Sequence, residues 1–589
     1  MDAPLVRLDS LDPRRGARSF RFGGFVRTLR ADRAGEVVPV LRAVERAVAD
    51  GLHAAGFVAY EAAPALDPAL ATRAADPRLP LAWFALFERR EEAGAGEDGD
   101  APDSAFELGE WEIGVAEGAY LANVERIRGL IAAGDTYQVN YTFPMRAPFT
   151  GDALALYRRM ARAQRSAYCA FLDLGDGISI ASASPELFFH WTGDALELRP
   201  MKGTRPRGRW LEEDAALGEE LAASPKDRAE NLMIVDLLRN DAGRVSEFGS
   251  VRVERLFEVE RYETVHQMTS TIRARARPGT TLTGLFRALF PCGSVTGAPK
   301  VRTCEIVAEL EEAPRGAYCG AIGYVSPGEA AFSVAIRTVV IDRDRGTAEL
   351  GVGSGVTYDS DPAAEYRECL SKAAFTRRAP NDLALLETMR WEPGRGIALL
   401  DLHLERLAKS AAYFGFSCDG DAIRSRLGAM GGGEARTVRL RLHRSGEVEI
   451  GDGPPLAWDA PVRLVLARRA IASDHPWLYH KTSRREIYDV EEDSGSDAMP
   501  LLVNERGELT EAPIANVVLE IDGERWTPAR ESGLLPGVFR EHLLRRGEVR
   551  ERVLVADDLA RASAVWVVNA VRGRGRAVVV GAAESAEPS

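Results

Sequence analysis

A polar, charged stretch in the second half of the chain divides the sequence and restricts how it can fold. Residues 374–382, AFTRRAPND, follow a strong helical pattern and precede a new strand pattern, as is typical of a domain boundary. A chain of 589 residues is long enough for about two to four domains. We therefore predict one large unit up to residue 375 and a second over 383–580, joined by a linker at 374–382 and followed by a tail at 581–589.

The composition argues against several classes of protein. A net charge of −13 disfavours a dedicated nucleic-acid binder, and no run approaches the roughly 18 apolar residues of a membrane span. The N-terminus, MDAPLVR, lacks the apolar core of a signal peptide. The six cysteines are scattered without a CxxC pair, which favours reduced thiols over a disulfide framework or a zinc site. These features predict a cytoplasmic enzyme that binds neither nucleic acid nor membrane.

Lysine is scarce in this chain. Of 75 lysine and arginine residues, only six are lysine. Arginine replaces lysine as a surface cation, but it keeps its proton and cannot act as an amine nucleophile. Each lysine is therefore a candidate for amine chemistry, although a composition bias alone would also leave a few. The six are Lys202, Lys226, Lys300, Lys372, Lys409 and Lys481.

Strand and helix patterns are mixed in the first unit and predict an α+β or α/β multidomain fold. Thr192-Gly193-Asp194 separates two strand patterns and predicts a β-hairpin. Asp361-Pro362 predicts the start of a helix, with aspartate as the cap and proline at the first position. On that helix Glu365, Glu368 and Lys372 lie at i, i+3 and i+7 and share one face. Taken alone, such a face is usually just solvated.

Five motifs of the first unit occur in combination. They are Ser184-Pro185-Glu186, Pro200-Met201-Lys202-Gly203-Thr204, the run from Lys226 to Asp241, the octapeptide from Gly293 to Lys300, and Gly353-Ser354-Gly355 followed by Asp361 to Glu368. With these motifs the sequence resembles the chorismate-utilising enzymes, which include anthranilate, isochorismate, salicylate and aminodeoxychorismate synthases. The resemblance is dense over residues 113–375. It implies a chorismate-binding two-sheet sandwich, preceded at 1–110 by the N-terminal subdomain of aminodeoxychorismate synthases.

The resemblance also implies roles for individual residues. Glu230 and Glu368, with Glu365 beside them, would hold a Mg²⁺ ion that binds a substrate carboxylate. Arg337 would clamp the other carboxylate with two hydrogen bonds, although by its local sequence it could equally be an ordinary arginine at a strand end. The further substrate contacts that we expect are Tyr318, His266, Thr296, Gly353, Ser354, Gly355 and Lys372.

Lys202 and Glu186 are the residues to which the resemblance gives the chemistry. Aminodeoxychorismate synthases have lysine in the Pro-x-x-Gly-Thr position, where anthranilate synthases have a small residue. The amine of Lys202 would add to ring C2 as the C4 hydroxyl leaves, and ammonia would then add at C4. Such an amine must be partly neutral, which requires a lowered pKa. Glu186 would be the general acid or base near the leaving hydroxyl, which requires a raised pKa.

The ammonia source is not encoded by a recognisable motif. No Gly-x-Cys-x-Gly nucleophile motif of a glutamine amidotransferase occurs in the sequence. We expect a separate glutaminase subunit, or ammonia in solution, to supply the nitrogen.

The second unit has its own ordered set of motifs. They are the segment at 403–407, LYHKTSRREIYD at 478–489, Leu509-Thr510-Glu511-Ala512, Gly537-Val538 at the start of a helical pattern, and Asn569. In this order they resemble the fold-type IV pyridoxal-phosphate enzymes, which include class IV aminotransferases and aminodeoxychorismate lyase. The resemblance implies pyridoxal 5′-phosphate as cofactor and a possible homodimer through this unit.

Pyridoxal-phosphate enzymes need a lysine, a carboxylate at the pyridine nitrogen and an anion site for the phosphate. By the resemblance, Lys481 binds the cofactor and transfers the proton, and Glu511 faces the pyridine nitrogen. Arg406 would bind the phosphate, together with free N–H groups at Gly537 and Val538. Glu511 or Arg406 alone would most often be a surface charge.

We interpret the chain as a bifunctional enzyme that converts chorismate to 4-amino-4-deoxychorismate and then, with loss of pyruvate, to 4-aminobenzoate. The second step is inferred from context, because the product of the first unit would be the substrate of the lyase. Two alternatives stay open, namely a class IV aminotransferase as the second unit and an anthranilate-type synthase as the first. A degenerate scaffold subunit is disfavoured, since the motif carboxylates and lysines are all present.

Overall fold

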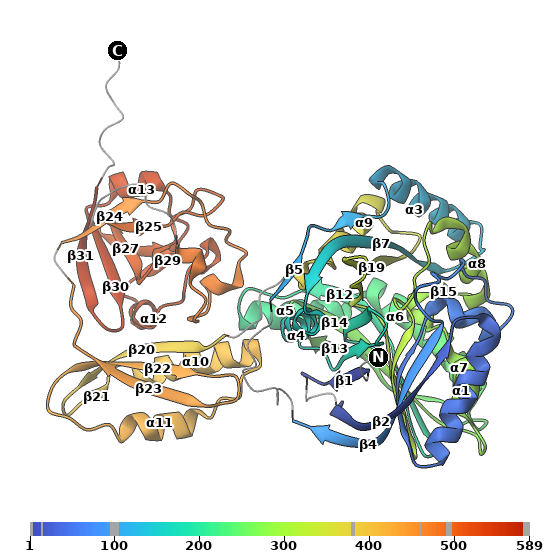
Figure 1. Ribbon diagram of the computed structural model, residues 1–589. Helices are drawn as coiled ribbons and strands as arrows, with labels where there is room; N and C mark the ends of the chain where they lie inside the picture. The colour runs from blue at the N-terminus through green and yellow to red at the C-terminus, as the bar shows by residue number, and fades with distance from the viewer. Residues whose placement is uncertain are drawn as a thin grey trace. The chain divides into compact units, whose positions relative to one another are not determined.

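The computed structural model describes residues 4–12, 16–94, 105–377, 383–458, 461–489 and 498–580. Most of the polar linker predicted at 374–382, and the whole tail at 581–589, lie outside these residues. The chain forms two compact units, one of residues 1–206 and 218–381 and one of residues 207–217 and 382–589 (Figure 1). Among the described residues no helix combines the length and hydropathy needed to span a bilayer.

The first unit is built on strands that form one 19-stranded sheet. These strands are β1 (Leu5–Asp9), β2 (Ser19–Ala31), β3 (His53–Val58), β4 (Ala82–Ala93), β5 (Phe106–Leu108), β6 (Glu112–Ile113), β7 (Gln138–Gly151), β8 (Tyr168–Asp173), β9 (Ile178–Ser184), β10 (Leu187–Thr192), β11 (Ala195–Arg199), β12 (Met201–Pro206), β13 (Arg252–Arg261), β14 (Val265–Arg275), β15 (Gly297–Ala298), β16 (Ala321–Ser326), β17 (Glu329–Val334), β18 (Thr338–Asp342) and β19 (Thr347–Val356). The helices that go with them are α1 (Ala34–Ala49), α2 (Ala63–Leu66), α3 (Glu117–Ala132), α4 (Ala153–Gln164), α6 (Pro225–Gly243), α7 (Leu282–Leu289), α8 (Lys300–Leu310) and α9 (Pro362–Ser371). Helix α5 (Leu211–Ala223) begins in the second unit and ends in the first.

Antiparallel pairing connects the strands of this sheet into one continuous path. The order is β13–β14–β11–β10–β17–β16–β3–β4–β2–β1–β8–β9–β18–β19–β7. Strand β12 pairs with β14 beside β11, and β5, β6 and β15 pair with β7. The segment predicted as an N-terminal subdomain contributes β1 to β5 to this same sheet.

The two halves of the sheet form the layers of a sandwich with helices outside, as predicted. One core packs α1 and α7 against strands such as β3 and β17, and another packs α3, α4, α8 and α9 against β7, β9 and β19. Between the halves lies a third core that includes Phe57, Trp83 and Ile180. Alternation places Val58 in an outer core and its neighbour Phe57 in the inner one, because successive side chains of a strand point to opposite faces.

Local signals in the sequence explain how the elements near the site begin. Asp361 accepts a hydrogen bond from the backbone N–H of Ala364 at 2.7 Å and caps α9, with Pro362 at the first position, as predicted. Ser224 caps α6 in the same way and is also followed by proline. The predicted hairpin at 192–194 is confirmed, since Thr192 and Ala195 pair across the turn between β10 and β11.

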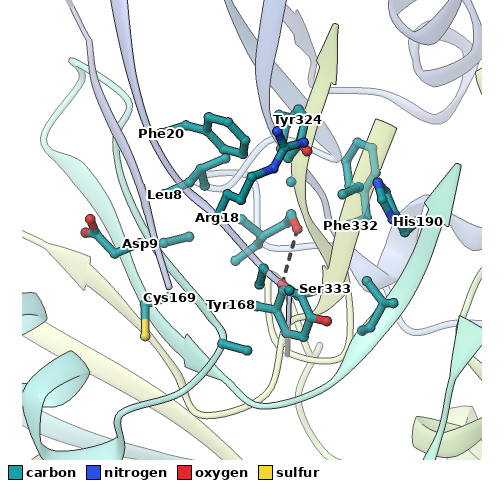
Figure 2. Close-up of a pocket in the computed structure, with 18 of the residues that line it drawn as sticks. Leu8, Asp9, Arg18, Phe20, Tyr168, Cys169, His190, Tyr324, Phe332 and Ser333 are labelled. Carbon is teal, nitrogen blue, oxygen red and sulfur yellow. Dashed lines mark hydrogen bonds between the residues drawn. The ribbon is translucent and has the colours of Figure 1, made fainter. Parts of the chain in front are cut away.

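A cavity of about 130 Å³ lies between strands of the inner face, separate from every predicted site residue. Leu8 and Phe20 line it from β1 and β2, and Tyr324 lines it from β16 (Figure 2). Arg18 and Glu329, which also line it, form an ion pair at 2.7 Å.

The second unit contains two sheets. The smaller, β21–β20–β22–β23, is antiparallel, and the larger runs β25–β24–β31–β30–β27–β28–β29 with β26 on β27. The strands are β20 (Leu385–Glu392), β21 (Gly396–Ile397), β22 (Arg436–Leu442), β23 (Val448–Gly453), β24 (Val462–Leu466), β25 (Met499–Leu501), β26 (Glu511–Ala512), β27 (Ala515–Ile521), β28 (Glu524–Pro528), β29 (Arg550–Arg552), β30 (Ala564–Asn569) and β31 (Gly573–Val579). The helices are α10 (Leu400–Phe414), α11 (Gly420–Gly428), α12 (Val538–Arg545) and α13 (Ala556–Arg561).

Candidate active sites

The first unit contains a polar cavity of about 420 Å³ to which β12, α6, β19 and α9 contribute residues. Ten of the predicted site residues line this one cavity. They are Glu186, Lys202, Glu230, Tyr318, Arg337, Gly353, Gly355, Glu365, Glu368 and Lys372. The motifs on which the resemblance rests therefore converge on a single site, although they span more than 180 residues of sequence.

Lys202 extends from β12 into this cavity. Its backbone is fixed by Asn231 of α6, whose side-chain amide donates to the carbonyl of Lys202 at 3.2 Å. Its ammonium group lies so near β19 that a Cβ atom on Gly355 would be 2.5 Å from Nζ, so this glycine leaves room for the amine. Burial lowers the pKa of Lys202 below its ordinary value, against the attraction of Glu230, and nearby Lys372 lowers it further. A lowered pKa is what an amine nucleophile requires.

Glu186 is 3% exposed and lines the same cavity from the loop between β9 and β10. That loop is held by Ser184, which donates to the carbonyl of Val334 at 2.6 Å and accepts from the N–H of Glu186 at 3.2 Å. Within the described residues Glu186 Oε1 has no hydrogen-bond partner although it is buried. Burial raises the pKa of Glu186 to about 7. The carboxyl group is therefore suited to give or take a proton near neutral pH.

The three predicted metal ligands line the cavity, and two of them are engaged with other groups. Glu368 pairs with Lys372 at 2.7 Å, and Glu365 accepts from the hydroxyl of Ser360 at 2.7 Å. Across the described ranges, no three or more histidine, cysteine, aspartate or glutamate side chains are grouped so that they could hold a metal ion. Carboxylates are chemically suited to Mg²⁺, but in this arrangement the three carboxylates do not form the expected metal site. The reaction steps proposed below therefore use side chains of the protein and no metal ion.

Arg337 lies between the end of β17 and the start of β18. Its φ of 52° is in the left-handed region, which non-glycine residues adopt at a cost and which is common at functional sites. The guanidinium donates to the carbonyl of Lys372 at 2.7 Å, and burial lowers its pKa. Nearby, the ring of Tyr318 covers Gly351 so closely that a Cβ atom there would lie 2.2 Å from it.

Three predicted contacts do not line the cavity. On β14, Gln267 lines the cavity instead of His266. On β19, Gly353 and Gly355 line the cavity, whereas the hydroxyl of Ser354 lies 3.0 Å from the hydroxyl of Tyr120. Both cases follow from strand alternation. In the third case, Thr296 turns its hydroxyl to the carbonyl of Cys292 at 3.1 Å, while Ser294 and Val295 line the cavity. The sequence motifs identified the correct segments but not which side chains face inward.

Two lysines of the first unit, Lys226 and Lys300, have no role assigned by the resemblance, and they lie in different surroundings. Lys226, which was not predicted as a site residue, lines the cavity with its neighbour Asp227. Lys300 instead donates to Asp241 at 2.7 Å and to the carbonyl of Leu289 at 3.0 Å. It is thus a structural ion pair away from the cavity.

Replacing Lys300 with methionine is expected to destabilise the first unit by about 3–5 kcal/mol, because the carboxylate of Asp241 would be left buried and unpaired. The two side chains are only 10% and 6% exposed. Urea unfolding followed by fluorescence measures the change. The double variant Lys300→Met/Asp241→Asn should recover part of the loss; a double variant as unstable as the single one would contradict the ion-pair explanation.

The second unit contains a cavity of about 460 Å³ lined by every residue predicted to bind a cofactor there. These residues are Arg406, Lys481, Glu511, Gly537 and Val538. The cavity is also lined by four residues that were not predicted as site residues, namely Arg439, Arg485, Tyr488 and Arg572.

Lys481 and Glu511 are the buried ionisable pair of this cavity. Burial lowers the pKa of Lys481 to about 8, and the positive charge of Arg406 acts in the same direction. Burial raises the pKa of Glu511 to about 7. Glu511 accepts hydrogen bonds from Tyr488 at 2.8 Å, from the N–H of Leu535 at 3.0 Å and from Asn516 at 3.0 Å. Three donors hold the carboxyl group in one orientation.

The phosphate side of the cavity is formed by Arg406 and the start of α12. Arg406 donates to Glu387 through Nε at 2.8 Å and Nη2 at 2.6 Å. Although burial would raise the pKa of Glu387, Arg406 and His403 hold it at about 2. Gly537 caps α12 and lies so near Asn516 that a Cβ atom would be 2.0 Å from its Oδ1. A buried amine, an oriented carboxyl group and an anion site fit pyridoxal phosphate.

Comparison with known proteins agrees with this division of the chain. The family of chorismate binding enzymes matches residues 27–378, and the amino-transferase class IV family matches residues 384–578. An aminodeoxychorismate synthase of Streptomyces pristinaespiralis is 47% identical over 44% of this chain and 36% of its own length. An anthranilate synthase component 1 of Streptomyces coelicolor is 43% identical over 45% of this chain and 51% of its own length. The chain thus spans about a third to a half of these relatives.

A solved structure supports the fold of the first unit. Anthranilate synthase component I from Streptococcus pneumoniae superposes with a TM-score of 0.53 at 28% identity, covering 62% of this chain and 92% of that one. Because relatives of both synthase types match at similar identity, similarity alone does not choose between para and ortho amination. The chain belongs to the chorismate-binding enzyme family and continues into an amino-transferase class IV domain.

Proposed function

We propose that this chain makes 4-aminobenzoate from chorismate in two steps, one in each unit. The observation that carries the proposal is the placement of Lys202 and Glu186 in one cavity of the first unit, both with pKa values moved toward neutrality. An anthranilate-type amination needs no lysine there. The relatives of this chain include an aminodeoxychorismate synthase, which agrees with this choice.

In the first step the amine of Lys202 attacks ring C2 of chorismate while the C4 hydroxyl leaves. The neutral carboxyl group of Glu186 gives the departing hydroxyl its proton, so that water is lost. Ammonia then adds at C4 and expels the lysine from C2, which restores the free amine and yields 4-amino-4-deoxychorismate. Arg337, Lys372 and Lys226 supply positive charge for the two carboxylates of the substrate.

For the second step, Arg406, Lys481, Glu511 and the start of α12 would hold pyridoxal phosphate in the cavity of the second unit. Bound pyridoxal phosphate supplies the electron withdrawal that makes the C4 proton acidic. The neutral amine of Lys481 would take that proton, and Glu511 would face the ring nitrogen of the cofactor. Lys481 would then return the proton to the methylene carbon of the departing enolpyruvyl group, so that pyruvate leaves and the ring becomes aromatic.

Product analysis of the purified chain with chorismate and an ammonium salt tests both steps. The ammonium salt replaces the glutaminase that we propose as a partner. We expect 4-aminobenzoate and pyruvate in equal amounts. Aminodeoxychorismate without pyruvate would favour an aminotransferase as the second unit, and an ortho amine would favour an anthranilate-type first unit. A chelator added to the same assay tests the Mg²⁺ requirement that the resemblance predicts.

Replacing Glu186 with glutamine is expected to slow chorismate consumption by about 10²–10⁴-fold, because the amide cannot donate the proton of an acid. The carboxyl group of the wild type is protonated below pH 7, so the step that needs it should slow as the pH rises through 7. The dependence of kcat on pH measures this, and the glutamine variant should lose that limb. A variant with wild-type kcat and the same limb would remove Glu186 from the mechanism.

In cofactor-free protein Lys481 is expected to react with an amine reagent at a far lower pH than an ordinary lysine. Its pKa of about 8 means that it is half neutral there, and only the neutral amine reacts. Labelling with acetic anhydride over pH 6–11, read by peptide mass spectrometry, measures the midpoint. Lys409, which is about half exposed and paired with Glu212, is the internal reference and should label only at higher pH. Equal midpoints for the two lysines would contradict the prediction.

A further inference from the structure

One segment belongs to the first unit by its place in the sequence but to the second by its contacts. Residues Arg207–Leu217 lie between β12 and α6, yet they cluster with residues 382–589. We call Arg207–Leu217 the crossing segment. Arg205 just before it and Lys226 just after it line the cavity of the first unit.

The crossing segment has a defined internal shape. The carboxylate of Asp214, which is 2% exposed, accepts from Arg207 Nε at 2.6 Å and from the N–H of Gly208 at 3.0 Å. A Cβ atom on Gly208 would lie 2.2 Å from the backbone nitrogen of Asp214. The segment is therefore a folded turn that only glycine permits at this position.

Aromatic and cationic contacts attach this turn to the residues directly before Lys481. The ring of Trp210 lies 5.0 Å from that of Tyr479, and the guanidinium of Arg530 lies 4.4 Å above Trp210. Arg209 donates to the hydroxyl of Tyr479 at 3.3 Å. Cation–π and aromatic contacts of this kind are favourable when shielded from water.

His480, the residue next to Lys481, is held between the crossing segment and α10. Its Nε2 is 3.2 Å from the carbonyl oxygen of Arg209, and its Nδ1 is 3.0 Å from the hydroxyl of Ser410. Because a carbonyl only accepts, Nε2 carries the hydrogen and Nδ1 accepts from Ser410. Burial lowers the pKa of His480 to about 3, so the ring is neutral. Its ring also stacks on Tyr413, whose hydroxyl donates to the carbonyl of Gly208 at 2.7 Å.

The backbone of Lys481 is thus fixed on two sides. Its carbonyl accepts from the N–H of Leu386 on β20 at 2.9 Å, and the preceding residue is bound to the crossing segment through Arg209. A lysine that must reach a cofactor atom depends on the orientation of the backbone that carries it.

We propose that the crossing segment positions Lys481, with His480 as the positioning residue that connects them. The cofactor site of the second unit then depends on a segment whose sequence lies between two stretches of the first unit. As a consequence, a cut between Pro206 and Gly218 would disturb the second site as well as the first. The spectroscopic test of this proposal rests on the proposed cofactor function of the second unit, whereas the hydrogen-exchange test does not.

The test uses the full-length chain and four variants. His480→Ala removes both hydrogen bonds, whereas His480→Gln keeps a donor for Arg209 and an acceptor for Ser410. Trp210→Ala loosens the crossing segment and leaves every residue of 382–589 unchanged. His443→Ala is the matched control, since His443 pairs with Glu449 at the surface of the same unit.

Two measurements are made on each variant. In protein loaded with pyridoxal phosphate, the pH midpoint of the cofactor absorbance reports the pKa of its link to Lys481. We expect His480→Ala and Trp210→Ala to shift this midpoint by roughly half a pH unit or more. In cofactor-free protein, amide hydrogen exchange across residues 478–483 should become at least about tenfold faster. His480→Gln and His443→Ala should stay near wild type in both measurements.

Unchanged midpoints and exchange in both disruptive variants would overturn the proposal. A shift in His480→Ala without one in Trp210→Ala would overturn the role of the crossing segment. If the wild type itself shows no cofactor band, the proposed function of the second unit fails, and the exchange measurement still decides whether the segment holds Lys481. A single cooperative thermal unfolding transition of the second unit, followed by circular dichroism, shows that each variant is folded.

Discussion

Replacing Lys202 with alanine is expected to abolish para amination of chorismate. The amine is the only nucleophile proposed for ring C2, so its loss should lower the rate by on the order of 10³-fold or more, as when other covalent nucleophiles are removed. Chorismate should still bind, because Arg337, Lys372 and Lys226 remain in the cavity. Liquid chromatography of products formed from chorismate and an ammonium salt measures the effect.

Two variants make this result specific to the amine. Lys202→Arg keeps a positive charge but cannot be deprotonated, so it should be as inactive as alanine. Lys409→Ala removes a lysine that lies outside both cavities and pairs with Glu212 and Glu405, so its rate should stay within about twofold of wild type, as for an exposed ion pair. Para amination by Lys202→Arg would show that Lys202 acts through charge and not as a nucleophile.

The product of Lys202→Ala also tests the branch of the family. With the small side chain that anthranilate synthases have at this position, any residual amination should place nitrogen ortho to the ring carboxylate. The ratio of para to ortho amine should therefore fall together with the rate. A variant that keeps a high para fraction would argue against attack at C2 by this lysine.

The sequence predicted segments better than side-chain directions. The motifs carrying Glu186, Lys202 and Glu368 were recognisable because their spacing is fixed by the chemistry of one substrate, and all three line one cavity. His266 and Ser354 were assigned to the site by motif position, but in each case the neighbouring residue of the strand lines the cavity instead. A shift of one residue along a strand moves a side chain to the other face of the sheet. A motif does not show which of the two alternating sets of residues faces the cavity.

The crossing segment could not have been predicted from the sequence. The predicted boundary at 374–382 agrees with the division of the chain after residue 381, but Arg207–Leu217 joins the second unit from within the first. Its attachment depends on contacts between Arg209 and Tyr479 across 270 residues. Local patterns such as periodicity and capping carry no information about a partner so far away in the sequence. Lys226 was not predicted as a site residue either, although it lines the cavity together with residues of β12 and α9.

Replacing Lys481 with alanine is expected to stop pyruvate release while leaving the first step intact. Among the described residues that line the second cavity, Lys481 is the only lysine, so we expect no other side-chain amine to hold the cofactor covalently or to take the C4 proton. Aminodeoxychorismate should therefore accumulate, with pyruvate formation lowered by on the order of 10³-fold or more. Coupled detection of pyruvate, alongside chromatography of the intermediate, measures both steps in one reaction.

The cofactor spectrum separates loss of chemistry from loss of binding. Lys481→Ala should still bind pyridoxal phosphate through Arg406, Glu511 and the start of α12, but the bound cofactor should show the absorbance of the free aldehyde. Lys481→Arg should behave in the same way, because a guanidinium does not act as an amine. Pyruvate release at the wild-type rate from either variant would exclude Lys481 as the proton carrier. Accumulation of the intermediate in these variants, and its absence in Lys202→Ala, would establish that the two lysines act in sequence on one substrate.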